Sequence, residues 1–539
     1  MQAQTNSPLR GAVDIASNAT HSCALMAAGG VRCWGDNTNG KLGDGSSINR
    51  NVATPVVGLQ DATGLSAGTW HSCAATRGGA RCWGDNDWVQ LGNGDVDAYD
   101  DGVESNELTP VGVVGLGAGA LGVAASGRHS CAVTAAGALV CWGTENIGEL
   151  GNGDQDNFGP NVWYAAPQPV GGLGSGVIQV SSYWKHSCAL TGAGDVYCWG
   201  ENVAGKLGDG STDNRYVATP VNGLGGSAVS IAVGEHHSCA AMATGIVKCW
   251  GANDFGQLGI GAFDGNDHPS PETVPGLSSI IRVAAGGDNS CALTDMGALT
   301  CWGRNDWGQL GNGDDNYDHQ SAPVAVSGLG SGVVAMSLGG SGSGASLPRA
   351  HSCAVLDGGE ARCWGYGNHG QLGDGLFIPG GIGNRYHNTP QVVLTPSVAV
   401  DLQLLIKRQP VSSRPGIDKR TTGGEPPRCY DITAANLGDD MITAVSLNIP
   451  APAGLSGVSW DCAAPSGCTP DSGSGALSTQ FDLAGGESAL ASLCGNVDAG
   501  AAFVDVAASV STSSAGGHGT SDLLIETANG IGVSKNGFE

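Results

Sequence analysis

Cysteine and histidine recur along the first 370 residues in a fixed order, and both residue types can ligate metals, undergo redox chemistry or catalyse reactions. The order is His-Ser-Cys, as in His21–Cys23, then about ten residues, then Cys-Trp-Gly, as in Cys33–Gly35. The block occurs seven times, with successive first cysteines 50 to 62 residues apart. The cysteine pairs are Cys23 and Cys33, Cys73 and Cys82, Cys131 and Cys141, Cys188 and Cys198, Cys239 and Cys249, Cys291 and Cys301, and Cys353 and Cys363.

The spacing within each cysteine pair favours a disulfide over a metal cluster. The two cysteines are nine or ten residues apart rather than in a short ligand turn. Side chains alternate along a strand, so folding a hairpin at Ala28–Gly30 sets Cys23 opposite Cys33, within disulfide reach. Free thiols used as small buried apolar groups are the alternative. A disulfide in every repeat suits an oxidising compartment.

The histidine of the block is interpreted as structural rather than catalytic. It occurs in six copies, and Asn289 replaces it in the other. The six are His21, His71, His129, His186, His237 and His351. We expect a buried polar side chain, hydrogen-bonded across a strand or blade boundary, a role that asparagine can also fill. The tryptophan after each second cysteine, from Trp34 to Trp364, is expected to pack between blades.

Each repeat predicts four short strands, and seven such units predict a propeller. In the first repeat the expected strands are Ala12–Ala16, His21–Leu25, Val31–Trp34 and Thr54–Val57. A repeat of this length is typical of propellers and solenoids. A solenoid needs a polar capping repeat at its ends, and the sequence shows none, which favours the propeller. The predicted fold class is therefore all-β, a seven-bladed β-propeller followed by a smaller β-sandwich domain.

The repeats divide the chain into four parts. Residues 1–10 form a polar lead, 11–395 the propeller, 396–530 the sandwich and 531–539 a tail. We expect the last Pro-Val strand, within 386–395, to complete the first blade and close the ring. About seven short strands after 396 predict an immunoglobulin-like sandwich. Its expected cysteine pairs are Cys429 with Cys494 and Cys462 with Cys468, although sequence does not fix the connectivity.

The repeats resemble those of the regulator of chromosome condensation family. The match is clear at 237–240 (His-Ser-Cys-Ala), at 249–259 (Cys-Trp-Gly-Ala-Asn-Asp-Phe-Gly-Gln-Leu-Gly) and at 301–311. The resemblance implies the propeller fold but not one function, because the family includes a nuclear exchange factor for a small GTPase, ubiquitin-ligase modules and secreted bacterial propellers, one of which inhibits β-lactamase. The paired cysteines resemble the secreted bacterial branch. Residues 434–438 and 483–486 resemble sandwich modules of bacterial surface proteins.

Composition limits the classes of partner that the protein could bind and the compartments in which it could act. The chain has 539 residues, 92 of them glycine, and a net charge of −26. No basic stripe is present to neutralise phosphates, which argues against nucleic acid, and no apolar run is long enough for membrane insertion. The start, Met1–Thr5, looks like a mature chain with an added methionine. We therefore expect a secretory signal to have been removed and the protein to be secreted or at the cell surface.

Variable loop positions are the predicted partner-binding residues, because binding residues tend to lie on loops held by a rigid scaffold. They stand just before the block histidine or in the loop that follows Trp-Gly. They are Trp70, Trp88, Tyr183, Trp184, Phe255, Trp307 and His369. If exposed, they would form interface anchors on one rim; otherwise they pack against neighbouring loops.

Several loops are rich in aspartate, and calcium is the one cofactor that the sequence suggests. The candidate ligands are Asp95, Asp97, Asp100 and Asp101. Alternating carboxylates can surround Ca²⁺, but the loop lacks the twelve-residue calcium pattern. Solvated acidic loops are the favoured alternative.

No catalytic motif is present: there is no Gly-x-Ser-x-Gly, no His-Glu-x-x-His and no phosphate-binding glycine-lysine loop. We therefore expect a monomeric, non-catalytic binding scaffold whose partner is a protein or, as second choice, a glycan. Two alternatives stay open. One is a secreted inhibitor of the β-lactamase-inhibitor kind, and the other is an enzyme that uses the central channel with carboxylates from the rim loops, for which channel-lining carboxylates with shifted pKa values would be the evidence. Nucleotide exchange on a GTPase is the weakest interpretation.

Overall fold

A computed structural model describes residues 6–95, 105–154, 162–340, 350–376 and 385–396, and beyond residue 400 the backbone of strands. The chain divides into two compact units, one with residues 6–56 and 61–396 and one with the C-terminal part from 397. Among the described residues, no helix has the length and apolar character that crossing a membrane requires.

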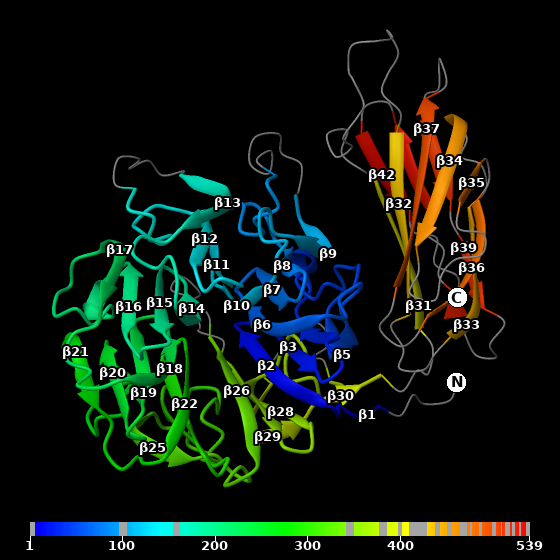
Figure 1. Cartoon of the computed structure of the whole chain (residues 1–539). Coiled ribbons are helices and arrows are strands. Elements are labelled where there is room, and N and C mark those ends of the chain that lie inside the picture. Colours follow the sequence, from blue (N-terminus) through cyan, green and yellow to red (C-terminus); the bar gives the residue numbers. More distant parts are fainter. Residues whose placement is uncertain are drawn as a thin grey trace. The chain divides into compact units, whose positions relative to one another are not determined.

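Within the described residues the first unit contains seven four-stranded antiparallel sheets, which follow one another around a ring in chain order (Figure 1). Blade 1 contains β2 (Ala12–Asn18), β3 (His21–Met26), β4 (Val31–Gly35) and β5 (Arg50–Pro55). Blade 2 contains β6 (Ala62–Ala67), β7 (His71–Thr76), β8 (Gly79–Gly84) and β9 (Glu107–Gly112). Blade 3 contains β10 (Ala120–Ala125), β11 (His129–Thr134), β12 (Leu139–Thr144) and β13 (Trp163–Pro169). Blade 4 contains β14 (Val177–Tyr183), β15 (His186–Thr191), β16 (Val196–Gly200) and β17 (Arg215–Pro220).

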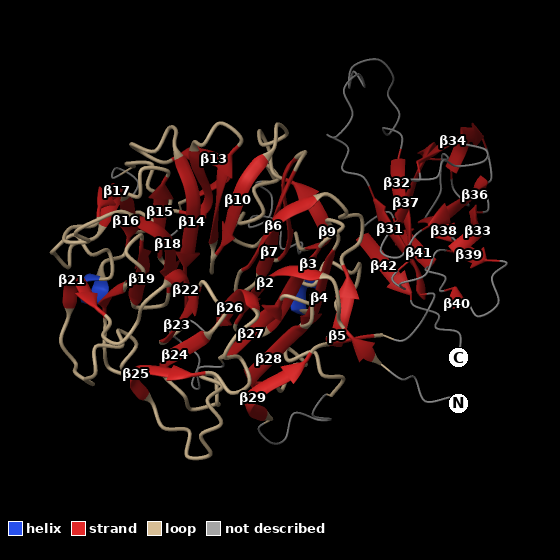
Figure 2. Ribbon diagram, turned by 60° about the horizontal axis from the view of Figure 1, so that its bottom comes forward, coloured by secondary structure: helices blue, strands red, loops and turns tan. Residues whose placement is uncertain are grey.

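The other three blades repeat this order. Blade 5 contains β18 (Ala228–Val233), β19 (His237–Met242), β20 (Val247–Gly251) and β21 (His268–Thr273). Blade 6 contains β22 (Ile280–Gly286), β23 (Asn289–Thr294), β24 (Leu299–Gly303) and β25 (Gln320–Ala325). Blade 7 contains β26 (Val333–Gly339), β27 (His351–Leu356), β28 (Ala361–Tyr366) and β29 (Tyr386–Val392). Two short 3₁₀ segments, η1 (Thr38–Gly40) and η3 (Val203–Gly205), are the helical elements of the described chain (Figure 2).

The fourth strand starts earlier than the sequence suggested. In blade 1 we expected Thr54–Val57, but β5 spans Arg50–Pro55 and the proline ends it. Proline carries no N–H to donate, so it suits the last residue of this outermost strand.

The hairpin register confirms seven disulfides. Cys23 faces Cys33 across β3 and β4, and the equivalent cysteines face each other in every blade. All seven pairs are bonded, with Cα atoms 4.0–4.1 Å apart. The sulfurs are buried, which leaves these cysteines unable to serve as accessible thiols.

Six of the block tryptophans pack in one apolar cluster with the disulfide of the blade before them. Trp142 lies in one apolar cluster with Cys73 and Cys82, and Trp34 lies with the disulfide of blade 7. The glycine of the Leu-Gly loop permits this contact: at Gly92, with φ +65°, a β-carbon would lie 2.5 Å from Trp142 Nε1. A side chain there would displace the indole, so both the conformation and the close approach require glycine.

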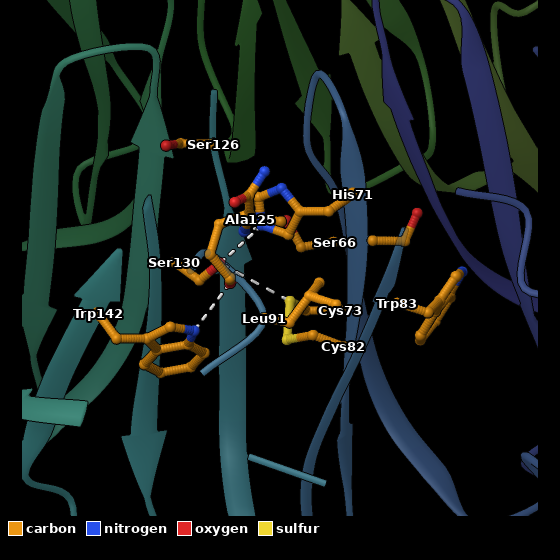
Figure 3. The surroundings of a disulfide bond; sticks show 12 residues. Ser66, His71, Cys73, Cys82, Trp83, Leu91, Ala125, Ser126, Ser130 and Trp142 are labelled. Atoms are coloured by element: carbon orange, nitrogen blue, oxygen red, sulfur yellow. Dashed lines mark hydrogen bonds between the residues drawn. A yellow bond between two sulfur atoms is a disulfide. The ribbon is translucent and has the colours of Figure 1, made fainter. Parts of the chain in front are cut away.

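A belt of histidine–serine hydrogen bonds joins adjacent blades at six of the seven junctions, and Figure 3 shows the junction of blades 2 and 3. His71 Nε2 lies 2.6 Å from Ser130 Oγ, and Ser130 Oγ donates to the Gln90 carbonyl at 2.9 Å. Trp142 Nε1 donates to the same carbonyl at 2.8 Å. Because the serine hydrogen is used on the carbonyl, the histidine must donate from Nε2. The six His–Ser bonds measure 2.6–3.1 Å, so the structural interpretation of the histidines is confirmed.

Asparagine does not fill the histidine's place, contrary to expectation. Both amide atoms of Asn289 are buried and lack a hydrogen-bond partner among the described residues. Ser352, the serine that a histidine there would reach, donates only to the Gln309 carbonyl at 2.8 Å. The asparagine side chain is shorter than histidine's, and the belt is broken at this one junction of the described ring.

Ring closure also differs from the expectation. The last long strand, β29, is the outer strand of blade 7 and not of blade 1. Closure comes instead from the chain ends: β1 (Ser7–Pro8) pairs with β30 (Leu394–Thr395), and Leu9 N donates to the Val393 carbonyl at 2.8 Å. Leu9 is 1% exposed in the core between blades 1 and 7.

The C-terminal unit is also built of strands. Its largest sheet has the order β35-β34-β37-β32-β31-β40, and two three-stranded sheets have the orders β36-β33-β39 and β38-β41-β42. Their bounds are β31 (Asp401–Arg408), β32 (Arg428–Asn436), β33 (Ile442–Ile449), β34 (Leu455–Ala463), β35 (Ser472–Ser474), β36 (Leu477–Leu483), β37 (Ser488–Val497), β38 (Phe503–Ala507), β39 (Ser509–Thr512), β40 (His518–Gly519), β41 (Leu523–Thr527) and β42 (Gly530–Ser534). Cys429 and Cys494 are register partners in β32 and β37, and Cys462 is disulfide-bonded. The immunoglobulin-like sandwich and both specific pairings stay predictions.

Candidate functional site

The loops on the histidine side of the blades form one rim of the propeller. In every blade the residue after Trp-Gly donates its N–H to the carbonyl of the residue before the block histidine, at 2.9–3.1 Å. Because the seven hairpins are equivalent, these residues lie on one face, which we call the His-side rim. The residues before the histidine position are Thr20, Trp70, Arg128, Lys185, His236, Asp288 and Ala350. Those after Trp-Gly are Asp36, Asp85, Thr144, Glu201, Ala252, Arg304 and Tyr366.

Three aromatic rings on this rim lie against cations of an adjacent blade. The Arg128 guanidinium lies 4.1 Å from the ring centre of Trp88, and that of Arg304 lies 4.3 Å from Phe255. Lys41 Nζ lies 5.5 Å from the Trp70 ring. At partly exposed sites such pairs contribute about 0.5–1 kcal/mol each. They hold large aromatic surfaces in place at the rim without burying them completely.

The inner side of the rim carries ion pairs between the loop and the residue after Trp-Gly. Lys41 Nζ lies 2.7 Å from Asp36, and Lys206 Nζ lies 2.7 Å from Glu201. Burial alone would raise the pKa of Asp36, but the Lys41 charge and the hydrogen bonds of Lys41 and Thr38 hold it below its usual value. Asp36 is therefore ionised at neutral pH, as an ion pair with a buried lysine requires.

The predicted partner-binding residues differ in exposure. Trp70 is 40% exposed. Trp88, Trp184, Phe255 and His369 are half-buried. These five therefore present surface at the rim, and their role in binding stays a prediction.

For Tyr183 and Trp307 the expectation of an exposed rim aromatic is wrong. Tyr183 is 5% exposed because it ends β14, an inner strand, and its hydroxyl donates to the Gly340 carbonyl of blade 7 at 2.5 Å. Burial raises the pKa of Tyr183 well above its ordinary value. Trp307 is 8% exposed, with its ring edge-on to Tyr366 at 5.2 Å. Both side chains belong to the packing between elements.

Comparison with known proteins gives the family. The RCC1-like domain matches residues 2–345, and the regulator of chromosome condensation (RCC1) repeat matches residues 349–371. The chain belongs to the RCC1-like family. The ultraviolet-B receptor UVR8 of Arabidopsis thaliana is 31% identical over 381 residues, 70% of this chain and 81% of the receptor. The human E3 ubiquitin-protein ligase HERC2 is 34% identical over 259 residues, 47% of this chain and 5% of the ligase.

Solved structures share the RCC1-like fold. Human WBSCR16 superimposes with a TM-score of 0.57 at 21% identity, covering 69% of this chain and 96% of that protein. Yeast RCC1 (Prp20), solved with Kap60, gives 0.55 at 21% identity over 73% of this chain and 89% of that chain. These likenesses support the propeller fold of this chain.

The central channel of this RCC1-like propeller contains a cavity of about 230 Å³ lined by the first strands of all seven blades. Its wall consists of small and aliphatic side chains and serines, with Asn18, Gln179 and Tyr183 as the larger polar groups. Among the described residues this wall holds no aspartate, glutamate, histidine or cysteine. The carboxylates that a channel active site was expected to use are therefore not in this cavity.

Most of the predicted calcium ligands lie outside the described residues. Asp95 is described, whereas Asp97, Asp100 and Asp101 are not. In the other acidic loops protein donors use the carboxylates: Asp154 accepts from the Tyr164 hydroxyl at 2.6 Å. In the described part of the chain no cluster of three or more histidine, cysteine, aspartate or glutamate side chains could hold a metal ion.

A second surface was missed from the sequence. In each blade the pairing of the first two strands skips one residue near the start of the first strand. In six blades this residue is aliphatic and 44–57% exposed, which an alternating strand pattern does not predict. The six are Val13, Leu121, Ile178, Val229, Ile281 and Val334. They surround the channel end opposite the His-side rim, and we call them the bulge ring.

Proposed function

We propose that this RCC1-like propeller is a protein-binding scaffold that recognises its partner through the His-side rim. The observation that supports this most is the set of three aromatic–cation pairs at Trp70, Trp88 and Phe255, each bridging adjacent blades. Tryptophan, tyrosine and arginine are the residue types that dominate binding energy in protein interfaces. Preordered side chains also lose less conformational entropy on binding.

The repeat separates buried structural positions from variable rim positions, and this separation supports the same proposal. The block histidine, cysteines and tryptophan are buried in the packing within and between blades, so they leave the variable rim positions as the part that distinguishes one propeller from another. Function resides in such variable sites rather than in the fold itself. Yeast RCC1 (Prp20) has been solved bound to Kap60, and Prp20p of Saccharomyces cerevisiae binds Gsp1p and histones. A protein partner for this chain is the corresponding expectation.

We also place the scaffold in an oxidising compartment, secreted or at the cell surface. Seven buried disulfides support this location, because such bonds form and persist outside the reducing cytosol. The net charge of −26 favours a partner with a basic surface, since opposite charge speeds encounter.

The test is affinity capture with the full, oxidised chain from extracellular and envelope extracts that contain both proteins and glycans. One variant removes rim anchors, Trp70→Ala with Arg128→Ala; its matched control alters the opposite face, Ile178→Ser with Ile281→Ser. Melting temperatures are compared first, so that only folded variants are scored. We expect the partner to be retained by the control and lost by the rim variant.

Retention by the rim variant with loss in the control would contradict the proposal and move the binding surface to the bulge ring. If the captured partner is a secreted hydrolase whose activity falls on binding, the scaffold acts as an inhibitor. If it is a polysaccharide, the ligand class is glycan.

A further inference from the structure

A pocket lies on the His-side rim between blades 3 and 4, and its chemistry differs from that of the equivalent place in other blades. The cavity measures about 260 Å³, and Thr144, Asn146, Glu149 and Trp184 contribute to its wall. A single water requires only about 15 Å³. The space can therefore admit a side chain.

The residue that corresponds to Glu149 lies six positions after the glycine of Trp-Gly. In three other blades this residue donates a hydrogen bond to the aspartate or glutamate that directly follows Trp-Gly. Lys41 Nζ lies 2.7 Å from Asp36 in blade 1, and Lys206 Nζ lies 2.7 Å from Glu201 in blade 4. In blade 2 an amide takes the role, with Gln90 Nε2 donating to Asp85 at 2.9 Å. In blades 1 and 4 the chain's own ammonium group fills the space, and both lysines are at most 1% exposed.

Blade 3 has a carboxylate at the first place, a threonine hydroxyl at the second, and neither a lysine nor an amide donor. The loop residue is Glu149, 4% exposed, and the residue after Trp-Gly is Thr144, 3% exposed. Glu149 Oε2 accepts from the N–H groups of Asn146 and Ile147, at 2.8 Å each. Thr144 Oγ1 and Asn146 Oδ1 are buried without a hydrogen-bond partner among the described residues. Such groups are costly unless a ligand or water supplies the missing bond.

The charge of Glu149 is likewise uncompensated. Burial raises its pKa above the ordinary value, although three backbone hydrogen bonds and the Lys185 charge act in the opposite direction. Glu145, which stands where blades 1, 2, 4, 5 and 6 have asparagine, has a pKa raised to about 8 by burial and by Glu149. A cation placed in the pocket would stabilise the ionised form of Glu149.

The cations already at the pocket have other partners. Arg128 stacks on Trp88, and Lys185 Nζ lies 3.3 Å from Glu201 with a side chain that is 44% exposed. His129 also lines the pocket but is neutral, because burial lowers its pKa to about 4 and both ring nitrogens contact serines.

We propose that the pocket between blades 3 and 4 binds the ammonium group of a lysine side chain presented by a protein partner. Glu149 supplies the countercharge, while Thr144 Oγ1 and Asn146 Oδ1 accept its remaining hydrogens. The half-buried indole of Trp184 packs beside the aliphatic stem. This inference rests on the proposed function and names the chemistry of the partner, and it agrees with the net charge of −26.

The test measures the pocket directly with a small probe. The full, oxidised chain is labelled with 5-fluorotryptophan, and the Trp184 ¹⁹F resonance is assigned by its loss in Trp184→Phe. Nα-acetyl-lysine N-methylamide is titrated, with the norleucine analogue as the control that lacks only the ammonium, and the glutamate analogue as the control of opposite charge. We expect the lysine probe to shift the Trp184 resonance and to bind at least about tenfold more tightly than the norleucine probe.

Two variants test whether the pocket prefers a positively charged ligand. Glu149→Gln restores the residue found at this place in blades 2, 5, 6 and 7, so it should fold, and it should weaken lysine binding at least about tenfold. Lys185→Ala removes a like charge and should strengthen binding. The inference is overturned if the norleucine probe binds equally, if Glu149→Gln changes nothing, or if only the glutamate probe binds and Lys185→Ala weakens it.

Failure of the lysine probe can be separated from failure of the proposed function. No shift with any probe would overturn the lysine pocket, while loss of capture in the rim variant would still support the scaffold. Lysine binding without rim-dependent capture would support the pocket and contradict the rim as the main interface.

Discussion

When the protein unfolds in acid, each buried neutral belt histidine takes up one proton. Replacing one of these histidines by asparagine should therefore lower the proton uptake on unfolding by one. His237 is fully buried, with Nε2 2.8 Å from Ser290 Oγ. Ser290 donates to the Gln257 carbonyl at 2.9 Å, so it must accept from His237. Nδ1 is buried without a partner among the described residues, and a proton there would have no acceptor. Burial, helped by the nearby His236, lowers the pKa of His237 from 6.5 to about 3.

The direction of the effect follows from this lowered pKa. Below pH 6.5 the unfolded state takes up a proton that the folded state refuses, so stability falls as the pH drops toward 3. Between pH 7 and pH 4.5, His237 should cost about 2.5 kcal/mol of unfolding free energy. His71, with a pKa of about 3, and His129, with a pKa of about 4, should act in the same direction.

The assay is urea unfolding of the wild-type chain and the His237→Asn variant at several pH values, with the disulfides intact. Asparagine already stands at the same place in blade 6, so the variant is expected to fold. At pH 7 the variant should be the less stable protein, because a buried hydrogen bond is lost. Relative to pH 7, the difference should move by about 2.5 kcal/mol in favour of the variant at pH 4.5, which is enough to make the variant the more stable protein there. A gap that stays constant with pH would refute the assignment of His237 as a buried neutral donor, since other titrating groups cancel in the difference.

Three further predictions concern stability. Asn289→His should complete the belt and raise the unfolding free energy by about 1 kcal/mol in urea unfolding; a decrease would show that blade 6 has no room for the ring. Glu145→Asn, which installs the residue of blades 1, 2, 4, 5 and 6, should stabilise the protein at neutral pH, because a buried carboxyl with a pKa of about 8 favours the protonated folded state and stabilises it only at low pH. This gain should be about 3 kcal/mol at pH 7 and vanish near pH 4.5; equal gains at both values would contradict it. Cys73→Ala with Cys82→Ala should cost about 2.7 kcal/mol by the chain-entropy relation for a ten-residue loop, measured as a lower denaturation midpoint, and no change would mean that this disulfide does not restrict the unfolded chain.

The repeated part of the molecule could be predicted because its signals are local and occur seven times. The repeat period predicted the seven blades, and the hairpin pattern predicted that Cys23 faces Cys33. The recurrence of histidine in the same block suggested a structural role within the ring. The outcome for Asn289 could not be predicted, because it depends on whether a shorter side chain reaches across a gap between blades. The ring closure was missed for a similar reason: Leu9 and Val393 are far apart in sequence, and their pairing is set by the closed ring.

The candidate site was less predictable than the fold. Residue type and loop position could not separate Trp70, which is 40% exposed, from Trp307, which is 8% exposed, because neighbouring loops decide the difference. The bulge ring could not be predicted, because a residue left out of the strand pairing breaks the alternation that assigns each side chain to one face of the sheet. The blade 3 pocket could have been noticed from Glu149, which stands where the other six repeats have glutamine or lysine, and from Glu145, which stands where five of them have asparagine.

Hydroxyl-radical oxidation of the full chain, alone and with the captured partner, tests most directly whether the His-side rim is the binding surface. Trp70, 40% exposed, reports on the rim, and Met296, 77% exposed in the turn between β23 and β24, reports on the opposite end of the blades. Our account predicts that the partner protects Trp70 from oxidation and leaves Met296 unchanged. Protection of Met296 with Trp70 unchanged would contradict it and place the partner on the face that carries the bulge ring.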